Sequence, residues 1–390
     1  MTDTRNRPPR DSYLVFGAPY IGEEERAEVL ACLDSGWIGS GPRASQLERE
    51  FSAYVGAKHA VALNSATAAL FLALKSLKLS PGAEVIAPSM TFCATVNAIV
   101  HAGFKPVLVD CDRDTMNMDP AALRGALTPK TEAVLPVHFA GRPCEMKDIM
   151  TIVDEKKLAL VEDCAHAVES TYEGKHCGTF GDFGAFSFYV TKNMSTAEGG
   201  MLISRKADDG DALRCKALHG LSKDAWNRFS DEGYVHYAVH EPGFKFNLTD
   251  LAASLGLHQL RRLDRAHAYR EKLWTFYMRE LADLPLTLPA PIPDNMRHAY
   301  HLFTCCVDDT KTRIRRDDVI TGLHRLNIGS GVHYIPVHAH PYYRETLAVS
   351  DEILPNASYI GERTFSIPLS MAVTQEDAAD VVAALRTVFQ

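Results

Sequence analysis

Several features are absent from this chain, and each absence excludes a class of protein. No run of about 18 uninterrupted apolar residues occurs, so no segment is predicted to span a membrane. Lysine and arginine number 41 against 49 acidic residues, a net charge of −8 with no basic cluster, which argues against a nucleic-acid partner. No Gly-x-Gly-x-x-Gly follows the first predicted strand, which excludes a nicotinamide-binding Rossmann protein.

Signs of disulfide bonding and secretion are missing as well. The nine cysteines are odd in number, scattered and never spaced as Cys-x-x-Cys, which is typical of reduced thiols. The adjacent Cys305 and Cys306 stand in an apolar run that predicts a buried strand. Residues 1–12 are polar and precede no apolar signal core, so we expect a flexible N-terminal arm and a cytoplasmic location.

The remaining composition is that of a globular protein, with 46% hydrophobic and 23% charged residues. Its 390 residues exceed the size at which one core keeps growing, so we expect two domains. Short apolar runs alternate with helical or turn-rich stretches at 59–63, 84–87, 106–110, 133–137 and 158–161. This alternation predicts an α/β fold with a mostly parallel sheet covered by helices on both faces.

The second half of the chain is organised differently. Two more strands are predicted at 184–190 and 201–204, and a long helix at 247–262 with Thr249 or Asn247 near its start. The polar stretch 206–242 is expected to end in a mobile loop. Beyond the helix, strands and helices mix and Pro-rich breaks occur. We therefore predict a large domain at 13–262 and a smaller C-terminal α+β domain at 263–390.

Lys192 is the most informative residue, because it follows a predicted strand and has an aspartate, Asp163, at the end of an earlier strand. Pyridoxal phosphate chemistry needs such a pair. The lysine amine forms a Schiff base with the cofactor aldehyde, and the carboxylate keeps the pyridine nitrogen protonated so that the ring accepts electrons. A lysine after a strand is by itself most often a solvated charge, so the pair together carries the prediction of an enzyme.

A phosphate site is predicted at the turn 64–67, Asn-Ser-Ala-Thr, between a strand and an Ala/Leu-rich helix. Small residues there let backbone N–H groups approach an anion, and the helix dipole favours its charge. The alternative is that Asn64 or Ser65 only caps the helix. Ligands of open α/β sheets bind at the carboxyl ends of the strands, where this turn, Asp163 and Lys192 are all expected.

The motifs that surround these residues resemble, in order, those of the DegT/StrS family of aminotransferases. They are Ser65-Ala-Thr-Ala-Ala-Leu, Ala87-Pro-Ser-Met-Thr-Phe92, Val161-Glu-Asp-Cys-Ala-His166, Phe186-Ser-Phe-Tyr-Val-Thr-Lys192-Asn, Ala197-Glu-Gly-Gly200 and Val332-His-Tyr-Ile-Pro-Val-His338. The likeness extends from about residue 13 to 385. It implies the type I fold of enzymes that depend on pyridoxal 5′-phosphate and that transfer an amino group from L-glutamate to nucleotide-linked keto sugars.

Carried over by position, the resemblance assigns roles in binding and catalysis. Lys192 bears the cofactor and acts as general base, and Asp163 pairs with the ring nitrogen. The other cofactor contacts are the amides of Ala66 and Thr67 and the hydroxyl of Ser187 at the phosphate, Phe92 stacked on the ring, and His166 near the 3′-hydroxyl. Each of these three side chains has a purely structural alternative: Ser187 as an outward-facing strand residue, Phe92 as part of the core, and His166 as a buried histidine with satisfied hydrogen bonds.

In this family the segment at 243–250 reaches the cofactor phosphate of the neighbouring subunit, which implies a homodimer with shared active sites. Many members have Gly-Tyr-Asn-Tyr-Arg where this chain has Gly-Phe-Lys245-Phe-Asn247. Lys245 offers a charge and Asn247 an amide donor, and either can bind a phosphate. We assign this contact to Asn247, with Lys245 as the alternative.

The substrate assignment rests on the resemblance alone. The turn Ala197-Glu198-Gly-Gly and the Lys/Asn version of the 243–250 segment resemble the UDP-4-amino-4-deoxy-L-arabinose type, which implies amination at C4 of a UDP-linked 4-keto sugar. Trp37, Lys245 and His333 are the predicted substrate contacts. The alternatives are a dTDP- or GDP-linked keto sugar, a cyclitol ketone and, from another class, a non-enzymatic regulator on the same fold.

Histidines offer a competing interpretation as a metal site, formed by His333, His338 and His340 with His138 and His219. However, no carboxylate stands at the spacing of a helical zinc motif, and two prolines interrupt regular geometry between these histidines. We therefore predict no metal.

Overall fold

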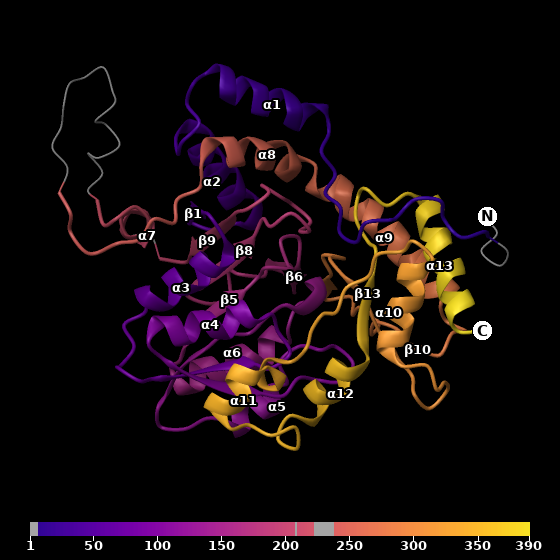
Figure 1. Ribbon diagram of the computed structural model, residues 1–390. Helices are drawn as coiled ribbons and strands as arrows, with labels where there is room; N and C mark the ends of the chain where they lie inside the picture. The colour runs from indigo at the N-terminus through magenta and orange to yellow at the C-terminus, as the bar shows by residue number, and fades with distance from the viewer. Residues whose placement is uncertain (1–6, 207–208, 222–237) are drawn as a thin grey trace.

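The computed structural model describes residues 7–206, 209–221 and 238–390 (Figure 1). Its larger part is a seven-stranded sheet of order β1-β9-β8-β5-β4-β2-β3. The strands are β1 (His59–Leu63), β2 (Glu84–Pro88), β3 (Lys105–Val109), β4 (Thr131–Val134), β5 (Ala159–Asp163), β8 (Phe183–Ser187) and β9 (Gly200–Ser204). Strand β9 is antiparallel to both neighbours and the other contacts are parallel, so the predicted mostly parallel sheet is confirmed.

Successive side chains of each strand point to opposite faces of the sheet, and helices cover and bury both faces. Val61, Val85 and Val161 pack on one side against α3 (Ala66–Ser76), α4 (Cys93–Ala102) and α7 (Asp209–Ala217). The other side is covered by α2 (Pro42–Val55), α5 (Pro120–Gly125), α6 (Met146–Lys156) and α8 (Asp250–Arg261). The result is a three-layer arrangement, with α1 (Glu23–Asp34) lying across α8 (Figure 1).

Helix α8 begins at Asp250, so that Thr249, and not Asn247, is the predicted residue at its start. Thr249 is its N-cap, and its hydroxyl accepts a hydrogen bond from the Ala252 amide at 3.2 Å. Asn247 is kept out of the helix because it forms a β-bridge with Leu63 at the end of β1. A contact distant in the sequence thus fixes the start of the helix.

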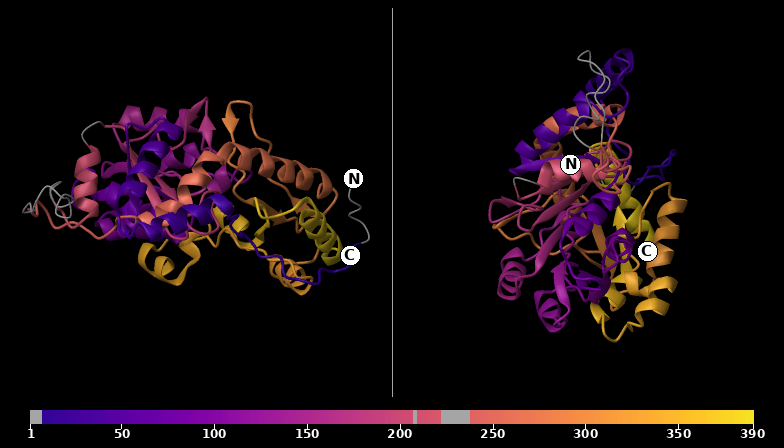
Figure 2. Two further views of the ribbon diagram at one scale, coloured as in Figure 1. Left: turned by 90° about the horizontal axis from the view of Figure 1, so that it is seen from above. Right: turned by 90° about the vertical axis from the view of Figure 1, so that its left-hand side faces the viewer.

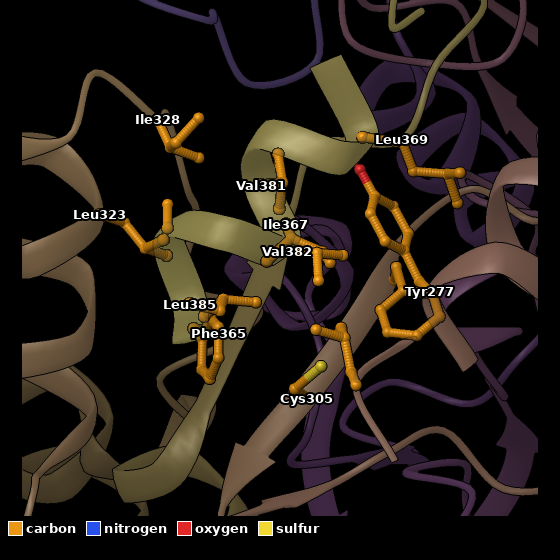
Figure 3. Packing of buried hydrophobic residues seen from close by; sticks show 14 of the residues in the cluster. Tyr277, Cys305, Leu323, Ile328, Phe365, Ile367, Leu369, Val381, Val382 and Leu385 are labelled. Atoms are coloured by element: carbon orange, nitrogen blue, oxygen red, sulfur yellow. The ribbon is translucent and has the colours of Figure 1, made fainter. Parts of the chain in front are cut away.

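The C-terminal part has a core of its own. Its antiparallel sheet contains β10 (Leu286–Thr287), β12 (Phe303–Val307) and β13 (Thr364–Ile367), packed with α9 (Leu263–Glu280), α10 (Arg316–Arg325) and α13 (Gln375–Val388). Figure 3 shows this core, in which Tyr277 and Cys305 face Phe365 and Leu385 across the buried space. Helix α9 extends from the large sheet domain into this smaller unit (Figure 2). Cys305 and Cys306 both lie in β12, as predicted.

Two features tie the C-terminal part to the large domain. Helices α11 (Pro341–Leu347) and α12 (Pro355–Arg363) share an apolar cluster with Met90, Leu108 and Phe139 of the large domain. A second small sheet pairs β11 (Met296–Arg297) with β6 (Thr171–Tyr172), which continues to β7 (Lys175–His176). Segments 296–303 and 333–340 are thereby held over the carboxyl ends of the central strands.

The amino-terminal segment is tied to the smaller domain. Arg7 and Arg10, within the expected flexible arm, form ion pairs with Asp380 of α13, and Arg10 also pairs with Asp377. The middle of the expected mobile loop, residues 222–237, lies outside the described residues, whereas α7 occupies its beginning. No helix in the described ranges is long and apolar enough to cross a bilayer.

Candidate active site

Lys192 lies on the loop that leaves β8 and returns as β9. Ser187 and Gly200, at the two ends of this loop, are paired across the sheet, so both ends are fixed. Burial lowers the pKa of Lys192 to about 8, and the negative charge of Asp163 opposes that shift. A lysine with this pKa is neutral far more often near pH 7 than an exposed lysine, and the neutral amine is the nucleophile that attacks a carbonyl.

Asp163 is the last residue of β5 and is buried. Its Oδ2 accepts a hydrogen bond from Thr95 Oγ1 at 2.9 Å, and its Oδ1 accepts one from the Ala165 amide at 3.0 Å. Burial raises the pKa of the carboxyl, although both hydrogen bonds and the charge of Lys192 oppose the change. A buried carboxylate of this kind is suited to a protonated ring nitrogen, which would supply the positive charge that its surroundings lack at contact distance.

The predicted phosphate turn combines both roles considered for it. Ser65 is the N-cap of α3, and its hydroxyl accepts a hydrogen bond from the Ala68 amide at 3.1 Å. The amides of Ala66 and Thr67 precede it in the first turn, where a helix offers them no carbonyl partner. Gly200 packs against the same turn, because a Cβ there would come within 2.6 Å of the Ala66 nitrogen. The cap and an anion can therefore use different donors of one turn.

Ser187 and Phe92 lie at two other strand ends. Ser187 pairs with Gly200, the residue that packs against the phosphate turn, and its Oγ accepts a hydrogen bond from the Tyr189 amide at 3.3 Å. Phe92 is the N-cap of α4 and is 56% exposed, which rules out the alternative that it is a core ring. Its ring centroid lies 5.7 Å from that of Tyr334. A large exposed ring at strand ends is suited to stacking on a heteroaromatic cofactor.

The protonation of His166 follows from its partners. Its Nδ1 accepts a hydrogen bond from the Ala140 amide at 3.2 Å, so the proton is on Nε2, which lies 3.0 Å from the Tyr334 hydroxyl. Burial and the charge of Lys192 lower the pKa of His166 well below its usual value, so the ring is neutral. His166 and Tyr334 thus form a neutral hydrogen-bonding pair beside the lysine.

The geometry joins a half-buried lysine, a buried aspartate and helix-terminal amides at strand ends of one sheet, which fits pyridoxal phosphate. A model of the DegT/DnrJ/EryC1/StrS aminotransferase family matches residues 19–386. The chain belongs to this family.

Relatives of the aminotransferase match it over nearly its whole length. It is 46% identical over 380 residues to the spore coat polysaccharide biosynthesis protein SpsC of Bacillus subtilis, covering 97% of this chain and 98% of SpsC. The putative sugar aminotransferase Spr1654 from Streptococcus pneumoniae, in its PLP form, has a TM-score of 0.88 and 32% identity, covering 96% and 98% of the two chains. DesI in the presence of its TDP-sugar product has a TM-score of 0.86 and 30% identity, covering 98% and 94%.

These relationships confirm the predicted family, fold class, enzyme class and cofactor. The protein is a sugar aminotransferase that depends on pyridoxal phosphate. The alternative of a non-enzymatic regulator is not supported, because Lys192 and Asp163 are both present and lie at the ends of neighbouring strands.

Three predicted contacts of the aminotransferase form a separate group at the start of α8. The amide of Asn247 donates a hydrogen bond to Ser40 Oγ, and Trp37 Nε1 donates one to the Ser40 carbonyl at 3.1 Å. Lys245 is exposed, and its carbonyl accepts a hydrogen bond from Asn64 Nδ2 at 3.4 Å. Within one chain, Asn247 is thus engaged with Ser40, whereas Lys245 is exposed and its backbone lies next to the phosphate turn.

His333, the remaining predicted substrate contact, belongs to the group around Lys192. Its Nδ1 lies 2.9 Å from Ser366 Oγ, and its ring centroid lies 5.0 Å from that of Tyr334. Burial, and then the charge of Lys192, lower the pKa of His333 to about 3, so it is a neutral hydrogen-bonding side chain.

Asn193, His301 and Tyr334 also lie in the site, although the motifs did not predict them as site residues. His301 Nε2 lies 3.5 Å from Lys192 Nζ, and His301 Nδ1 lies 3.0 Å from Asn193 Oδ1. Asn193 follows Lys192 and Tyr334 follows His333 in the sequence, so their place next to predicted site residues could have indicated them. His301 precedes β12 in the smaller domain and reaches the lysine only through the packing of the two domains.

The histidines considered as metal ligands have separate partners. His138 donates from Nε2 to Glu162 at 3.1 Å, and the same carboxylate also accepts hydrogen bonds from three backbone amides. His338 Nε2 lies 3.0 Å from Asp351, far along the chain from the partners of His138. Glu162, His138 and Cys164 are close enough to ligate an ion, but the ring nitrogens of His138 and the Glu162 oxygens are already used in hydrogen bonds.

Proposed function

We propose that this enzyme transfers the amino group of L-glutamate to C4 of a UDP-linked 4-keto sugar, as in the UDP-4-amino-4-deoxy-L-arabinose type. The placement of Lys192 and Asp163 at adjoining strand ends carries the aminotransfer chemistry. A nucleotide-linked acceptor is supported by the likeness to DesI, which was solved with a TDP-sugar product. The choice of C4 and of UDP is supported by the Ala197-Glu198-Gly-Gly turn and the Lys/Asn version of the 243–250 segment.

The catalytic roles follow from the two ionisable groups, Lys192 and Asp163. Pyridoxal phosphate, when bound, withdraws electrons from the carbon that loses a proton. Lys192 would hold the cofactor until the amino donor displaced it, and its amine could then take a proton from the donor's Cα and return it at C4′ of the cofactor. Its pKa of about 8 lets the same amine accept and release that proton near neutral pH. Asp163 keeps the ring nitrogen protonated throughout. A keto sugar then receives the amine by the reverse sequence.

Binding of the cofactor is divided among groups that do not react. The amides of Ala66 and Thr67, with the Ser187 hydroxyl, hold the phosphate at the N-terminus of α3. Phe92 covers one face of the ring, and His166 orients the ring from the 3′-hydroxyl side. Because these groups are separate from Lys192 and Asp163, cofactor binding and catalysis can be impaired independently.

The enzyme is also proposed to act as a homodimer in which the group at the start of α8 completes the partner's site. Leu30, Leu33, Trp37 and Ile38 are all at least 44% exposed, and such a concentration of exposed apolar side chains is typical of an interface. Lys245 is exposed as well, and Asn247, two residues further on, is hydrogen-bonded to Ser40, whose carbonyl accepts from Trp37. A second copy that covers the apolar patch would bring Trp37, Lys245 and Asn247 toward a neighbouring crevice.

The substrate is tested with a panel of acceptors. Purified enzyme and L-glutamate are incubated with the 3-keto and 4-keto sugars of UDP, dTDP and GDP, and with a keto-inositol, and the products are identified by mass spectrometry. Preferential amination of a UDP-linked 4-keto sugar is expected. A clear preference for any 3-keto sugar would overturn the C4 assignment, and preference for dTDP, GDP or the cyclitol would replace the UDP assignment.

A further inference from the structure

A buried chain of polar side chains leads from α9 to the amine of Lys192. Arg270 of α9 forms an ion pair with Glu169, and both side chains are almost completely buried. Glu169 Oε2 accepts a hydrogen bond from Asn193 Nδ2 at 2.9 Å. Asn193 Oδ1 lies 3.0 Å from His301 Nδ1, and His301 Nε2 lies 3.5 Å from Lys192 Nζ. The chain therefore ends on the atom that reacts with the cofactor.

The hydrogen-bond partners determine which nitrogen of His301 carries the proton. Asn193 Nδ2 donates to the Glu169 carboxylate and to the Ala299 carbonyl at 2.8 Å, and both of these groups are acceptors only. The Asn193 amide oxygen must then face His301, and it can only accept. The proton of His301 is thus on Nδ1, and the lone pair of Nε2 faces Lys192.

The surroundings of His301 keep its ring neutral. Burial lowers the pKa of His301 well below its usual value, and the charges of Lys192 and Arg270 act in the same direction. The His166 ring also faces it, with centroids 4.6 Å apart. Asp163 is the acidic group that acts on the same amine, because its charge raises the pKa of Lys192. His301 is therefore an acceptor toward Lys192 and does not compete with it as a cation.

We propose that His301 is a positioning residue for Lys192: its Nε2 accepts one N–H of the released amine and so directs the amine's lone pair toward the donor's Cα. A neutral amine has two N–H groups and one lone pair, so one fixed hydrogen bond removes most of its rotational freedom. The proton that leaves Cα goes to Lys192 Nζ and then to C4′, while His301 keeps its Nδ1 proton. This proposal rests on the proposed role of Lys192 as the residue that bears the cofactor.

Two amide substitutions separate the positioning contact from the rest of the network. The amide of glutamine in His301→Gln can place an acceptor near the position of Nε2. The shorter side chain in His301→Asn can keep the bond to Asn193 but does not reach Lys192. His298→Asn is the matched control, because His298 is a buried histidine of the same segment whose Nδ1 accepts from the Tyr300 amide, a bond that asparagine can replace.

The first measurement uses the apoprotein. Lys192 is labelled with acetic anhydride across a pH series, and the extent is read by peptide mass spectrometry. The midpoint is expected near the pKa of about 8 in the native protein. Since an acceptor stabilises the ammonium form, the midpoint should fall by about one pH unit in His301→Asn and stay near the native value in His301→Gln and His298→Asn. An unchanged midpoint in a folded His301→Asn, or an equal shift in the control, overturns the proposal.

The second measurement is turnover of the loaded enzyme. His301→Asn should lower kcat about tenfold with little change in KM for glutamate, because it loses orientation and not substrate binding, and His301→Gln should recover most of that loss. Loss of kcat in both variants to the same extent contradicts positioning through Nε2. Borohydride reduction of native holoenzyme tests the underlying role separately: a cofactor adduct on another lysine removes Lys192 as the cofactor residue even if His301→Asn shifts its labelling.

Discussion

Arg270 and Glu169 form an ion pair in which both partners are almost fully buried, with side chains 2% and 0% exposed. Arg270 belongs to α9, whereas Glu169 follows β5 in the large domain. The other oxygen of the carboxylate is bound by Asn193, the residue after Lys192. The pair therefore connects the helix that leads into the smaller domain to the loop that carries Lys192.

Replacing Arg270 with methionine should destabilise the protein strongly, because Glu169 would remain charged and buried without a cation. The expected loss is about 3–5 kcal/mol in the free energy of unfolding, measured by denaturant titration of the apoprotein. The double variant Arg270→Met with Glu169→Gln should recover part of this loss, since glutamine removes the charge and still accepts from Asn193. Equal stability of the single and double variants would contradict the argument.

Lys192→Ala should abolish turnover and also the cofactor adduct that borohydride reduction traps. The physical reason is that no other amine in the site is expected to replace both the covalent link and the proton transfer. Adduct formation is followed by the mass of the reduced protein and by peptide mapping. Lys58→Ala, a change at an exposed lysine, is the control and should retain both.

Asp163→Asn should lower turnover by roughly 10²-fold or more and leave cofactor binding largely intact, because the phosphate contacts are separate. Since burial raises the pKa of Asp163, its contribution to stability is largest at low pH and is lost as pH rises through the folded-state pKa. The neutral asparagine should therefore not destabilise the apoprotein at pH 7. A large fall in its melting temperature there would point to a structural role.

Cofactor attachment should depend on pH according to the lowered pKa of Lys192. The neutral amine reacts, so the rate at which apoprotein takes up pyridoxal phosphate should rise through a midpoint near pH 8 and level off above it. The same shift implies that the free energy of unfolding gains a contribution from Lys192 between about pH 8 and its ordinary value of 10.5. Stopped-flow absorbance measures the rate. A rise that continues to pH 10 would show an unperturbed lysine.

The shared-site proposal predicts complementation between inactive chains. Lys192→Ala and Asn247→Ala subunits, mixed and exchanged, should form heterodimers with one intact site, giving about a quarter of native activity in a random mixture. Repeating the mixture with Lys245→Ala in place of Asn247→Ala tests which residue serves the neighbouring phosphate. No recovery after exchange verified by native mass spectrometry would mean that the segment acts within its own subunit.

Much of the fold was predictable because local signals and burial agree. The strands of the central sheet are short apolar runs, and their expected positions are confirmed within a few residues. The sequence left the start of α8 open between Thr249 and Asn247, because Asn247 is bridged to Leu63, a partner that helical spacing does not reveal. Likewise, the ion pairs of Arg7 and Arg10 with α13 join distant parts of the sequence, so an arm that looks flexible by composition is partly held.

The candidate site was predictable for those reactive side chains that follow a recognisable strand. Asp163 and Lys192 follow strands of one sheet, and the topology brings such positions together. His301 carries no such signal, because its approach to Lys192 depends on how the smaller domain packs over the sheet. The sequence also did not show that Trp37 and Asn247 lie apart from His333, because the order of motifs along the chain does not tell which residues face the same crevice.

The pairing of Ser187 with Gly200 has a consequence for how substrates can enter and leave. Because β8 and β9 are hydrogen-bonded to each other and flanked by β5 and β1, the sheet fixes the position of the loop that carries Lys192. His301 and His333, by contrast, come from the smaller domain. A hinge motion of that domain would therefore change the positions of His301 and His333, while Lys192 and a cofactor bound to it would stay with the sheet, so that a bulky sugar substrate could be released without loss of the prosthetic group.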